Sequence, residues 1–295
     1  MNGILIVYKE AGFTSFDVIA KLRGILGMKK IGHTGTLDPM ATGVLPVLLG
    51  NATRISDYLT DYQKCYIAGV KLGITTDTED ITGTVLSEKP VNDVTEDELQ
   101  KVIPSFLGDI MQLTPMYSAR KVNGQKLVDL ARKGITVERE KKPVCIKELT
   151  VSHFSQADGT FTMKVLCSKG TYVRTLCHDI GEALGCGACM TSLQRVRTGQ
   201  YEIAEAHTLS EIEEAKKAGR IEELVYPTDS VFTAYDKAEV TEKGKKFLLN
   251  GNPLRPEHLC APCKTAKIRV YLDGSFAALY EFRNGLYRPD KMFLT

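Results

Sequence analysis

The spacing of apolar residues changes several times along the chain and predicts strands and helices in irregular order. A short apolar run at residues 3–8 predicts a buried strand. Thr14, followed three residues later by Asp17, has the pattern of a capped helix start. The predicted helix would carry four apolar residues on one face and end at a glycine (Phe16, Ile19, Leu22, Leu26; Gly27).

Elements of both kinds continue beyond this first helix. The sequence predicts strands at 64–72, 144–154, 160–167 and 192–198, and helices from Thr95 to Pro104 and at 125–133, 172–184 and 211–218. Asp158-Gly159 lies between two of these strands and has the composition of a hairpin turn. Because hairpins take the place of repeated βαβ units, we expect an α+β fold with a mixed or antiparallel sheet.

The pattern changes near residues 227–235. Beyond it the sequence predicts one helix at 242–249, ended by Asn250-Gly251, and short strands near 267–272, 275–282 and 286–287. A chain of 295 residues is long enough for two domains. We therefore expect a larger domain at 1–230 and a small β-rich module at 231–295.

The composition is that of a globular protein, with 43% hydrophobic residues. No segment approaches the ~18–20 consecutive apolar residues of a membrane span. The first residues contain a short apolar run but no basic leader or small-residue cleavage site, so we expect no signal peptide. These features favour a cytoplasmic protein that makes no membrane contact.

Positive charge is concentrated in one stretch, although the net charge is only +2. Residues 115–147 hold nine Lys or Arg and three Asp or Glu, whereas the stretches 77–98 and 202–223 are acidic. A basic stretch can be an ordinary solvated face. Its concentration here favours a polyanionic partner such as a phosphate backbone.

The loop at residues 32–43 contains one carboxylate, Asp38, and three glycines. Pro39 biases Asp38 toward an extended backbone, and the glycines allow backbone angles or close approaches that other residues resist. The loop has no Lys after its glycines, which excludes a P-loop. From the residues alone, a simple turn and a stiff functional loop that admits a flat ligand both remain open.

Eight cysteines include two C-x-x-C pairs, Cys186/Cys189 and Cys260/Cys263. About 70 residues separate the pairs, far more than usual in a zinc site, and neither pair has the strand-to-helix setting of a thioredoxin motif. We expect free cysteines in a reduced protein and no metal, with zinc as the alternative.

Six blocks of the chain form a recognisable series. GHTGTLDPMATGVLPV occupies residues 32–47, and the others are 3–19, 64–66 with 73–80, 115–119, 167–174 and 193–199. Taken together and in order, these blocks resemble the TruB-type tRNA pseudouridine-55 synthases, and the block at 32–47 is similar to the catalytic motif of that family.

The resemblance implies the pseudouridine synthase fold, with a mixed, largely antiparallel sheet and a PUA-like RNA-binding module at the C-terminus. It implies conversion of a uridine to pseudouridine in the T-arm loop of tRNA, at position 55, without a cofactor. The basic stretch 115–147 stands where the family carries an insertion that closes over the RNA arm. Candidate phosphate contacts there are Arg120, Lys121, Lys126, Arg132 and Lys133.

Three residues would carry the chemistry. The resemblance makes Asp38 the nucleophile, which could attack the base or sugar or remove a proton. Arg174 would pair with Asp38 and keep it ionised, since a neighbouring Arg lowers a carboxylate pKa by roughly 1–3 units. Tyr66 would stack on the target base and could move a proton. Taken alone, these would be a turn carboxylate, a surface arginine and a core tyrosine.

Three more residues would bind the substrate. Tyr172 and Leu193 would line the pocket and hold the uracil while it turns, although core packing explains Leu193 almost as well. His33 would fill the space left by the extracted base and offset part of its stacking energy, or else bond within its own loop. The chain departs from the family at Glu10, where a proline is usual, and at Val128, where an aromatic residue is usual.

Other functions remain open at this stage. A non-catalytic RNA-binding or RNA-folding protein would use the same basic stretch and small module. A guide-RNA-dependent synthase of the dyskerin type shares the catalytic motif but works with protein partners. A uridine methyltransferase would need a methyl-donor site and a reactive cysteine, and neither motif is present. We expect a stand-alone enzyme, with no obligatory protein partner, that acts as a monomer on tRNA.

Overall fold

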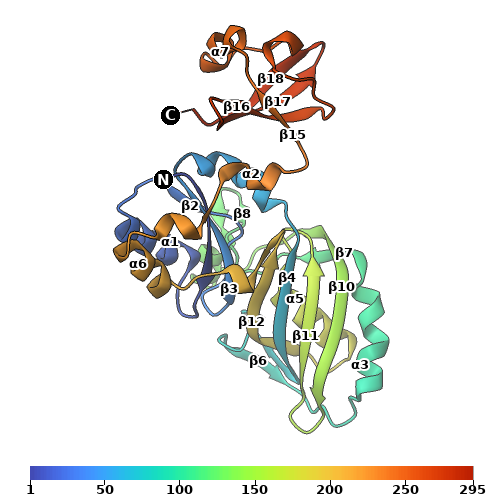
Figure 1. Ribbon diagram of the computed structural model, residues 1–295. Coiled ribbons are helices and arrows are strands. Elements are labelled where there is room, and N and C mark those ends of the chain that lie inside the picture. Colours follow the sequence, from blue (N-terminus) through green and yellow to red (C-terminus); the bar gives the residue numbers. More distant parts are fainter. Residues whose placement is uncertain (295) are drawn as a thin grey trace.

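The computed structural model describes residues 1–294, which form one large sheet, one smaller sheet and two two-stranded sheets. Figure 1 shows the large sheet and the smaller one as separate layers. The path through the large sheet is β14 (Val225–Tyr226), β1 (Gly3–Lys9), β3 (Thr42–Leu49), β12 (Ala188–Thr198), β4 (Lys64–Leu72), β11 (Thr160–Cys167), β10 (Lys141–Ser155) and β7 (Gly108–Leu113). Two short strands join it, β2 (Ile31–His33) beside β3 and β13 (Tyr201–Glu202) beside β12. The pairs are antiparallel except β3 with β12. The predicted α+β fold with a mixed, largely antiparallel sheet is confirmed.

Helices cover the two halves of this sheet separately. α1 (Ser15–Leu26) and α6 (Leu209–Lys217) share an apolar cluster with β1 and β3. α5 (Val173–Ala183) and α3 (Glu96–Val102) share another cluster with β4 and β11. Figure 1 shows the two groups at different ends of the sheet. The catalytic-loop candidate, residues 34–41, lies between β2 and β3, at the junction of the two halves.

The first predicted helix is confirmed in its bounds but not in its apolar face. Thr14 caps α1 with Asp17 in a capping box, and Gly27 ends the helix in the left-handed conformation. Phe16, however, is 65% exposed, and the buried face includes Val18 instead. The predicted face was wrong at this position because the buried stripe runs through Ser15, Val18, Leu22 and Leu26, at spacings of three and four residues, and Phe16 lies to one side of it.

Two other predictions need correction in extent. The helix expected at 125–133 is the short α4 (Leu127–Ala131), because residues before it form a small hairpin of β8 (Lys121–Val122) and β9 (Gln125–Lys126). The strand expected at 192–198 begins at Ala188, since the first residues of β12 pair with the end of β4. Other short elements include α2 (Ser56–Thr60) and the paired strands β5 (Ile74–Thr76) and β6 (Val85–Glu88).

The second sheet forms the small C-terminal module. Its strands run in the order β15 (Asp236–Glu239), β16 (Lys267–Leu272), β17 (Ser275–Arg283) and β18 (Leu286–Met292), beside α7 (Glu242–Leu249). The sequence predicted α7, β16 and β17 but missed β15 and most of β18. Both are edge strands with mainly polar residues, and Pro289 in β18 is a residue that an edge strand tolerates.

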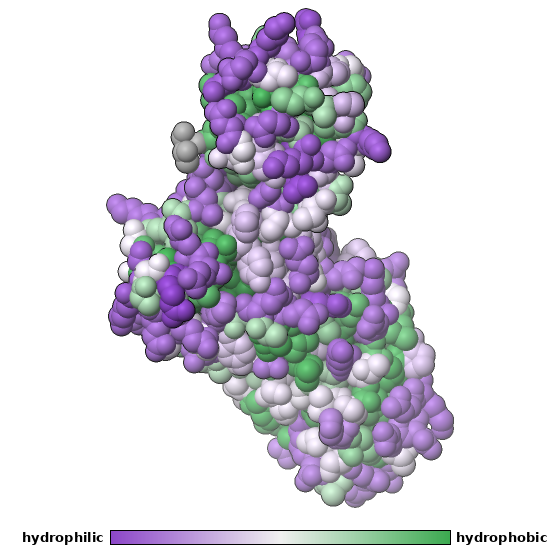
Figure 2. Space-filling view, viewed as in Figure 1, coloured by the Kyte–Doolittle hydropathy of each residue, from purple (hydrophilic) through white to green (hydrophobic). Residues whose placement is uncertain are grey.

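This module projects from the rest of the molecule and carries mainly hydrophilic residues on the face seen in Figure 2. It is nevertheless joined to the large sheet by a shared apolar cluster in which Leu279 and Phe293 pack with Ile4 and Leu48. Asn51 Nδ2 donates to the Phe293 carbonyl at 2.9 Å. No helix within residues 1–294 combines the length and apolarity needed to cross a membrane.

Candidate active site

The loop that carries Asp38 is held by buried side chains from distant parts of the chain. Lys9, at the end of β1, is fully buried, and its ammonium donates to the carbonyls of Ala41 at 2.6 Å and Pro39 at 3.2 Å. Burial lowers the pKa of Lys9 to about 8. The amide of Leu37 donates to the Ser15 hydroxyl at the start of α1, at 2.9 Å. The backbone on either side of Asp38 is therefore fixed.

Arg195 on β12 holds the same loop from the other side. It is fully buried, and its guanidinium donates from Nε to the Val44 carbonyl at 2.7 Å and from Nη2 to the Gly35 carbonyl at 2.9 Å. Gly43 has φ +103, and a Cβ there would come within 2.2 Å of the Arg195 carbonyl oxygen. Only glycine fits this close approach without strain.

Sequence reasoning missed Arg195 and the role of Lys9. Arg195 lies two residues beyond Leu193, so it shares that residue's buried face of β12. An arginine in phase with buried apolar residues was the signal that could have revealed it. Lys9 likewise stands at the end of the apolar run of β1 and is buried with it.

Asp38 and Arg174 lie together, as predicted. Asp38 Oδ2 is 3.5 Å from Arg174 Nη1, and the Asp38 side chain is 38% exposed whereas that of Arg174 is 6% exposed. The same Nη1 is 3.9 Å from Asp80 Oδ2, a carboxylate that sequence reasoning did not single out. Asp80 is oriented by Thr82, whose amide donates to Asp80 Oδ1 at 2.9 Å. The arginine is thus buried between two carboxylates, and only Asp38 is substantially open to solvent.

A cleft of about 660 Å³ opens beside Asp38. Its lining includes five residues predicted for catalysis or substrate binding, two further buried charged residues, and five residues of the basic stretch (Asp38, Tyr66, Arg174, Tyr172, Leu193; Asp80, Arg195; Tyr117, Ser118, Ala119, Val128, Arg132). The position at which the sequence departs from the family, Val128, therefore does face the candidate site.

Aromatic and apolar groups form the walls of this cleft. Tyr66 on β4 is 8% exposed, and burial raises the pKa of its hydroxyl above its usual range. Leu193 on the adjacent strand β12 is also 8% exposed. Tyr172, just before α5, has its ring 5.8 Å from the Arg174 guanidinium. A flat ring can lie among these side chains with Asp38 at its edge.

His33 lies outside this cleft lining. It is the last residue of β2, partly buried, and its Nδ1 is buried without a hydrogen-bond partner. Burial, with the nearby Arg195 charge, lowers the pKa of His33, which keeps the ring neutral near pH 7. The predicted place for His33 against the RNA is neither supported nor contradicted by this position.

The five candidate phosphate contacts are all exposed, but the structure spreads them over two hollows and the surface. Arg132 lines the cleft beside Asp38. Arg120 and Lys121 line a separate hollow of about 510 Å³ together with Arg139 and Lys142. Lys126 precedes α4 and Lys133 follows it, both on the exterior.

All eight cysteines are free thiols. Cys186 and Cys189 are buried near the start of β12, as expected for packed free cysteines, and Cys260 is exposed in the C-terminal module. Within residues 1–294, no three His, Cys, Asp or Glu side chains are grouped as they would be around a metal ion.

The chemistry available in the cleft is that of the exposed carboxylate of Asp38, with the buried Asp80 beside the same guanidinium. Asp38 faces a space bounded by Tyr66, Tyr172 and Leu193 and is paired with a buried guanidinium. Such a carboxylate can add to an electrophilic carbon or remove a proton. The walls can hold an aromatic ring during either step.

Comparison with known proteins agrees with this arrangement. Residues 23–173 match the TruB family pseudouridylate synthase (N terminal domain), and residues 174–233 match the tRNA pseudouridylate synthase B C-terminal domain. A protein of Lachnoclostridium phytofermentans named tRNA pseudouridine synthase B is 47% identical over 308 aligned residues, covering 100% of both chains. A protein of the same name from Clostridium novyi is 47% identical over 281 residues, covering 95% of each.

Solved structures share the fold. A chain of a Cbf5-Nop10-Gar1 complex aligns with 99% of this chain and 85% of its own length, with a TM-score of 0.74 and 24% identity. A chain of an H/ACA RNP bound to a substrate RNA containing 2'-deoxyuridine gives a TM-score of 0.72 at the same identity and coverage. Since the two family matches span most of its length and its relatives match nearly end to end, this chain belongs to the TruB family of pseudouridylate synthases.

Proposed function

We propose that this protein converts a uridine in the T-arm loop of tRNA, at position 55, to pseudouridine, acting alone and without a cofactor. The observation that carries the proposal is the pairing of Asp38 with the buried Arg174 at a cleft walled by Tyr66, Tyr172 and Leu193. The names of its end-to-end relatives support tRNA as the substrate.

In the proposed reaction the N1–C1′ bond of the uridine breaks, the uracil rotates, and C5 bonds to C1′. The C5 hydrogen is lost and N1 gains one, so the net change is an isomerisation. Asp38 either adds to the nucleotide or removes a proton to begin cleavage. Arg174 keeps Asp38 ionised, and the apolar walls hold the free base while it turns.

The base must first leave the RNA stack, which costs a few kcal/mol. We assign His33, as a neutral ring, to the space that the base vacates. Arg132 at the cleft and the other basic side chains of residues 115–147 would contact the phosphate backbone. We assign residues 1–230 to catalysis and the module at 231–295 to RNA binding, in a monomer that meets its tRNA in the cytoplasm.

The test is an assay of the purified protein alone on unmodified tRNA labelled at uridine. Pseudouridine is expected at one position of the T-arm loop. Asp38→Asn should lower the rate at least about 10³-fold, because the reacting group is lost, while tRNA affinity stays within about twofold. Asp57→Asn is the matched control, since Asp57 is an exposed carboxylate that pairs with Lys291.

Two results would contradict the proposal. A wild-type protein that binds tRNA but forms no pseudouridine would favour the non-catalytic RNA-binding alternative. Product that forms only after a guide RNA is added would favour the dyskerin-type alternative.

A further inference from the structure

We propose that Tyr117 is a positioning residue for Arg174, and that its hydrogen bond to Asp77 links the basic stretch to the catalytic ion pair. This inference deepens the proposed function and rests on it for the role of Arg174. Nothing in the sequence singled out either Tyr117 or Asp77 for a role of its own.

The first link is between Tyr117 and Arg174. The Tyr117 carbonyl accepts a hydrogen bond from Arg174 Nη2. Nη1 of the same guanidinium faces Asp38 and Asp80, whereas its buried Nε has no partner. The planar guanidinium is therefore oriented by three chain segments, and the Tyr117 carbonyl is the one that faces Nη2.

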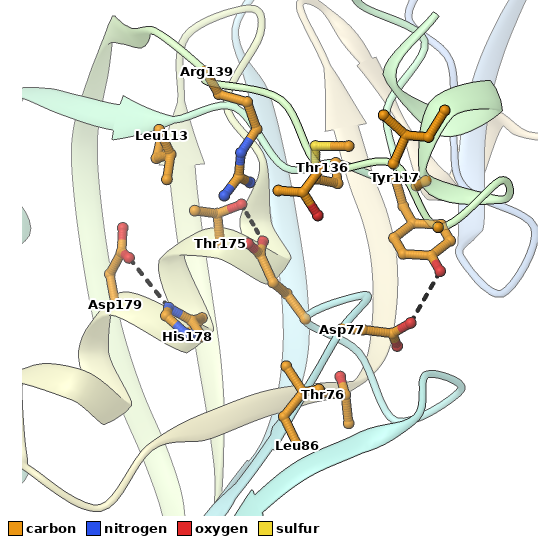
Figure 3. A pocket seen from close by; sticks show the side chains of 15 residues that line it. Thr76, Asp77, Leu86, Leu113, Tyr117, Thr136, Arg139, Thr175, His178 and Asp179 are labelled. Carbon is orange, nitrogen blue, oxygen red and sulfur yellow. Dashed lines mark hydrogen bonds and ion pairs between the residues drawn. The ribbon is translucent and has the colours of Figure 1, made fainter.

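The second link fixes Tyr117 itself. Its hydroxyl donates to Asp77 Oδ2 at 2.9 Å, and the other Asp77 oxygen accepts from the Thr84 amide at 2.7 Å. Figure 3 shows Tyr117 and Asp77 facing each other across one side of a pocket. The hydrogen bond to Asp77 raises the pKa of the Tyr117 hydroxyl. Asp77 is held by its own turn and can serve as a fixed anchor for the ring.

Tyr117 has open space on two sides. It lines the cleft of Asp38 and also the second pocket, of about 500 Å³, whose apolar wall includes Leu86, Leu113 and Ile135. Tyr117 is half-buried, so packing covers only part of its surface. The bond to Asp77 therefore helps to hold Tyr117, and with it the carbonyl that faces Arg174.

The third link leads from Tyr117 into the basic stretch. The next residue, Ser118, accepts a hydrogen bond from the Val128 amide at 3.0 Å, and the Arg120 carbonyl accepts from the Leu127 amide at 2.7 Å. These bonds tie the segment after Tyr117 to α4, which Arg132 follows. Contact of Arg132 with RNA would thus act on the segment that orients Arg174.

The test replaces Tyr117 by phenylalanine, which keeps the ring and the backbone and removes the hydroxyl. The single-turnover rate of pseudouridine formation should fall about tenfold, the usual effect of losing one hydrogen bond to a charged group, while tRNA affinity stays within about twofold. Asp77→Ala should give a similar loss. The double variant should lose no more than either single one, because both remove the same bond.

Tyr226→Phe is the matched control, because the Tyr226 hydroxyl also donates to a carboxylate, Glu205, at 2.6 Å. It should leave the rate unchanged. A wild-type rate for Tyr117→Phe, losses that multiply in the double variant, or a loss confined to tRNA affinity would each overturn the proposal.

A readout independent of activity separates this inference from the proposed function. Side-chain 15N NMR of Arg174 should show distinct Nη signals in the wild type and averaged ones in Tyr117→Phe. Unchanged Arg174 signals would overturn the positioning role even in an active enzyme. Averaged signals in a protein that forms no pseudouridine would support it and contradict only the proposed function.

Discussion

Buried cations surround Asp38, the more exposed of the two carboxylates beside Arg174. Lys9 and Arg195 are fully buried and donate to four carbonyls of residues 35–44, and Arg174 pairs with Asp38 itself. A buried charge is costly unless it is hydrogen-bonded, so these cations fold only with the loop in place. The loop is held in turn by these cations and by Leu37 and Ala41, which are buried in the apolar cluster under β4 and α5.

Glu79 offers a test at the scale of one residue. It is a non-glycine residue with φ 65, and its carboxylate accepts from the Thr175 hydroxyl in α5. Burial is the main cause that raises the pKa of Glu79 above its ordinary value of 4.5. The folded protein therefore binds this proton more tightly than the unfolded chain, and stability from Glu79 decreases as the pH rises above 4.5.

Glu79→Gln removes the buried charge and keeps an oxygen that can accept from Thr175. We expect a higher midpoint of thermal unfolding than the wild type at pH 8 and no difference at pH 4, where both side chains are neutral. Thermal melts at the two pH values measure this. A variant that is less stable than the wild type at pH 8 would contradict the assignment of Glu79 as a destabilising buried charge.

At this scale the sequence predicted which residues share the cleft, but not the whole of its lining. Asp38, Arg174, Tyr66, Tyr172 and Leu193 line one cleft as the resemblance implied. The sequence did not single out Asp80, because it lies in a turn rich in polar residues. Nothing in the residue pattern distinguishes it there from other carboxylates. Which carbonyls a buried cation contacts depends on the packing of strands that are far apart in the sequence.

Among the elements, the parallel pair of β3 and β12 is the one that assembles the site. It places Thr42 opposite Gln194 and Gly43 opposite Arg195, so the end of the Asp38 loop meets the strand that carries Leu193. The sequence predicted these strands approximately. The sequence did not predict that β3 and β12 are neighbours. Local residue patterns carry no information on which strands pair when they lie about 150 positions apart.

Gly43→Ala tests this pairing. The added Cβ would lie 2.2 Å from the Arg195 carbonyl oxygen, and the backbone at φ +103 is strained for alanine. We expect a loss of about 2 kcal/mol or more in the free energy of unfolding, measured by urea denaturation. We also expect a lower rate of pseudouridine formation.

Gly24→Ala is the control for this substitution. Gly24 is in α1, and an added Cβ there meets no other atom within 4 Å. Alanine should stabilise this helix position by about 0.5–1 kcal/mol. If the two variants were equally stable, the close approach at Gly43 would not constrain the fold.

Capped helices were the elements that the sequence predicted best. Thr14 and Thr95 both cap their helices in capping boxes, because the signal lies within four residues. Edge strands such as β15 were missed, since only Ala238 in it is buried and no alternation of apolar residues results.

At the scale of the whole molecule, the C-terminal module is less independent than its separate sheet suggests. The sequence predicted a separate small module because the residue pattern changes near 227–235. The cluster that joins Phe293 and Leu279 to Ile4 and Ile55 has no local signal, since it combines the two ends of the chain.

Phe293→Ala tests this joint. Phe293 is 7% exposed and its ring centroid lies 4.8 Å from that of Phe276. Truncating a buried phenylalanine costs about 3 kcal/mol, and we expect differential scanning calorimetry to show one transition at a lower temperature. Phe16→Ala, at a position 65% exposed, should have almost no effect. Two separate transitions, with only one of them shifted, would show that the module unfolds by itself.

The order in which the residues around Asp38 occur has a consequence for synthesis of the chain. Asp38 leaves the ribosome early, but Arg174 follows 136 positions later and Arg195 later still. Asp38, Arg174 and Arg195 therefore cannot meet until the chain has been synthesised beyond residue 195, about two thirds of its length.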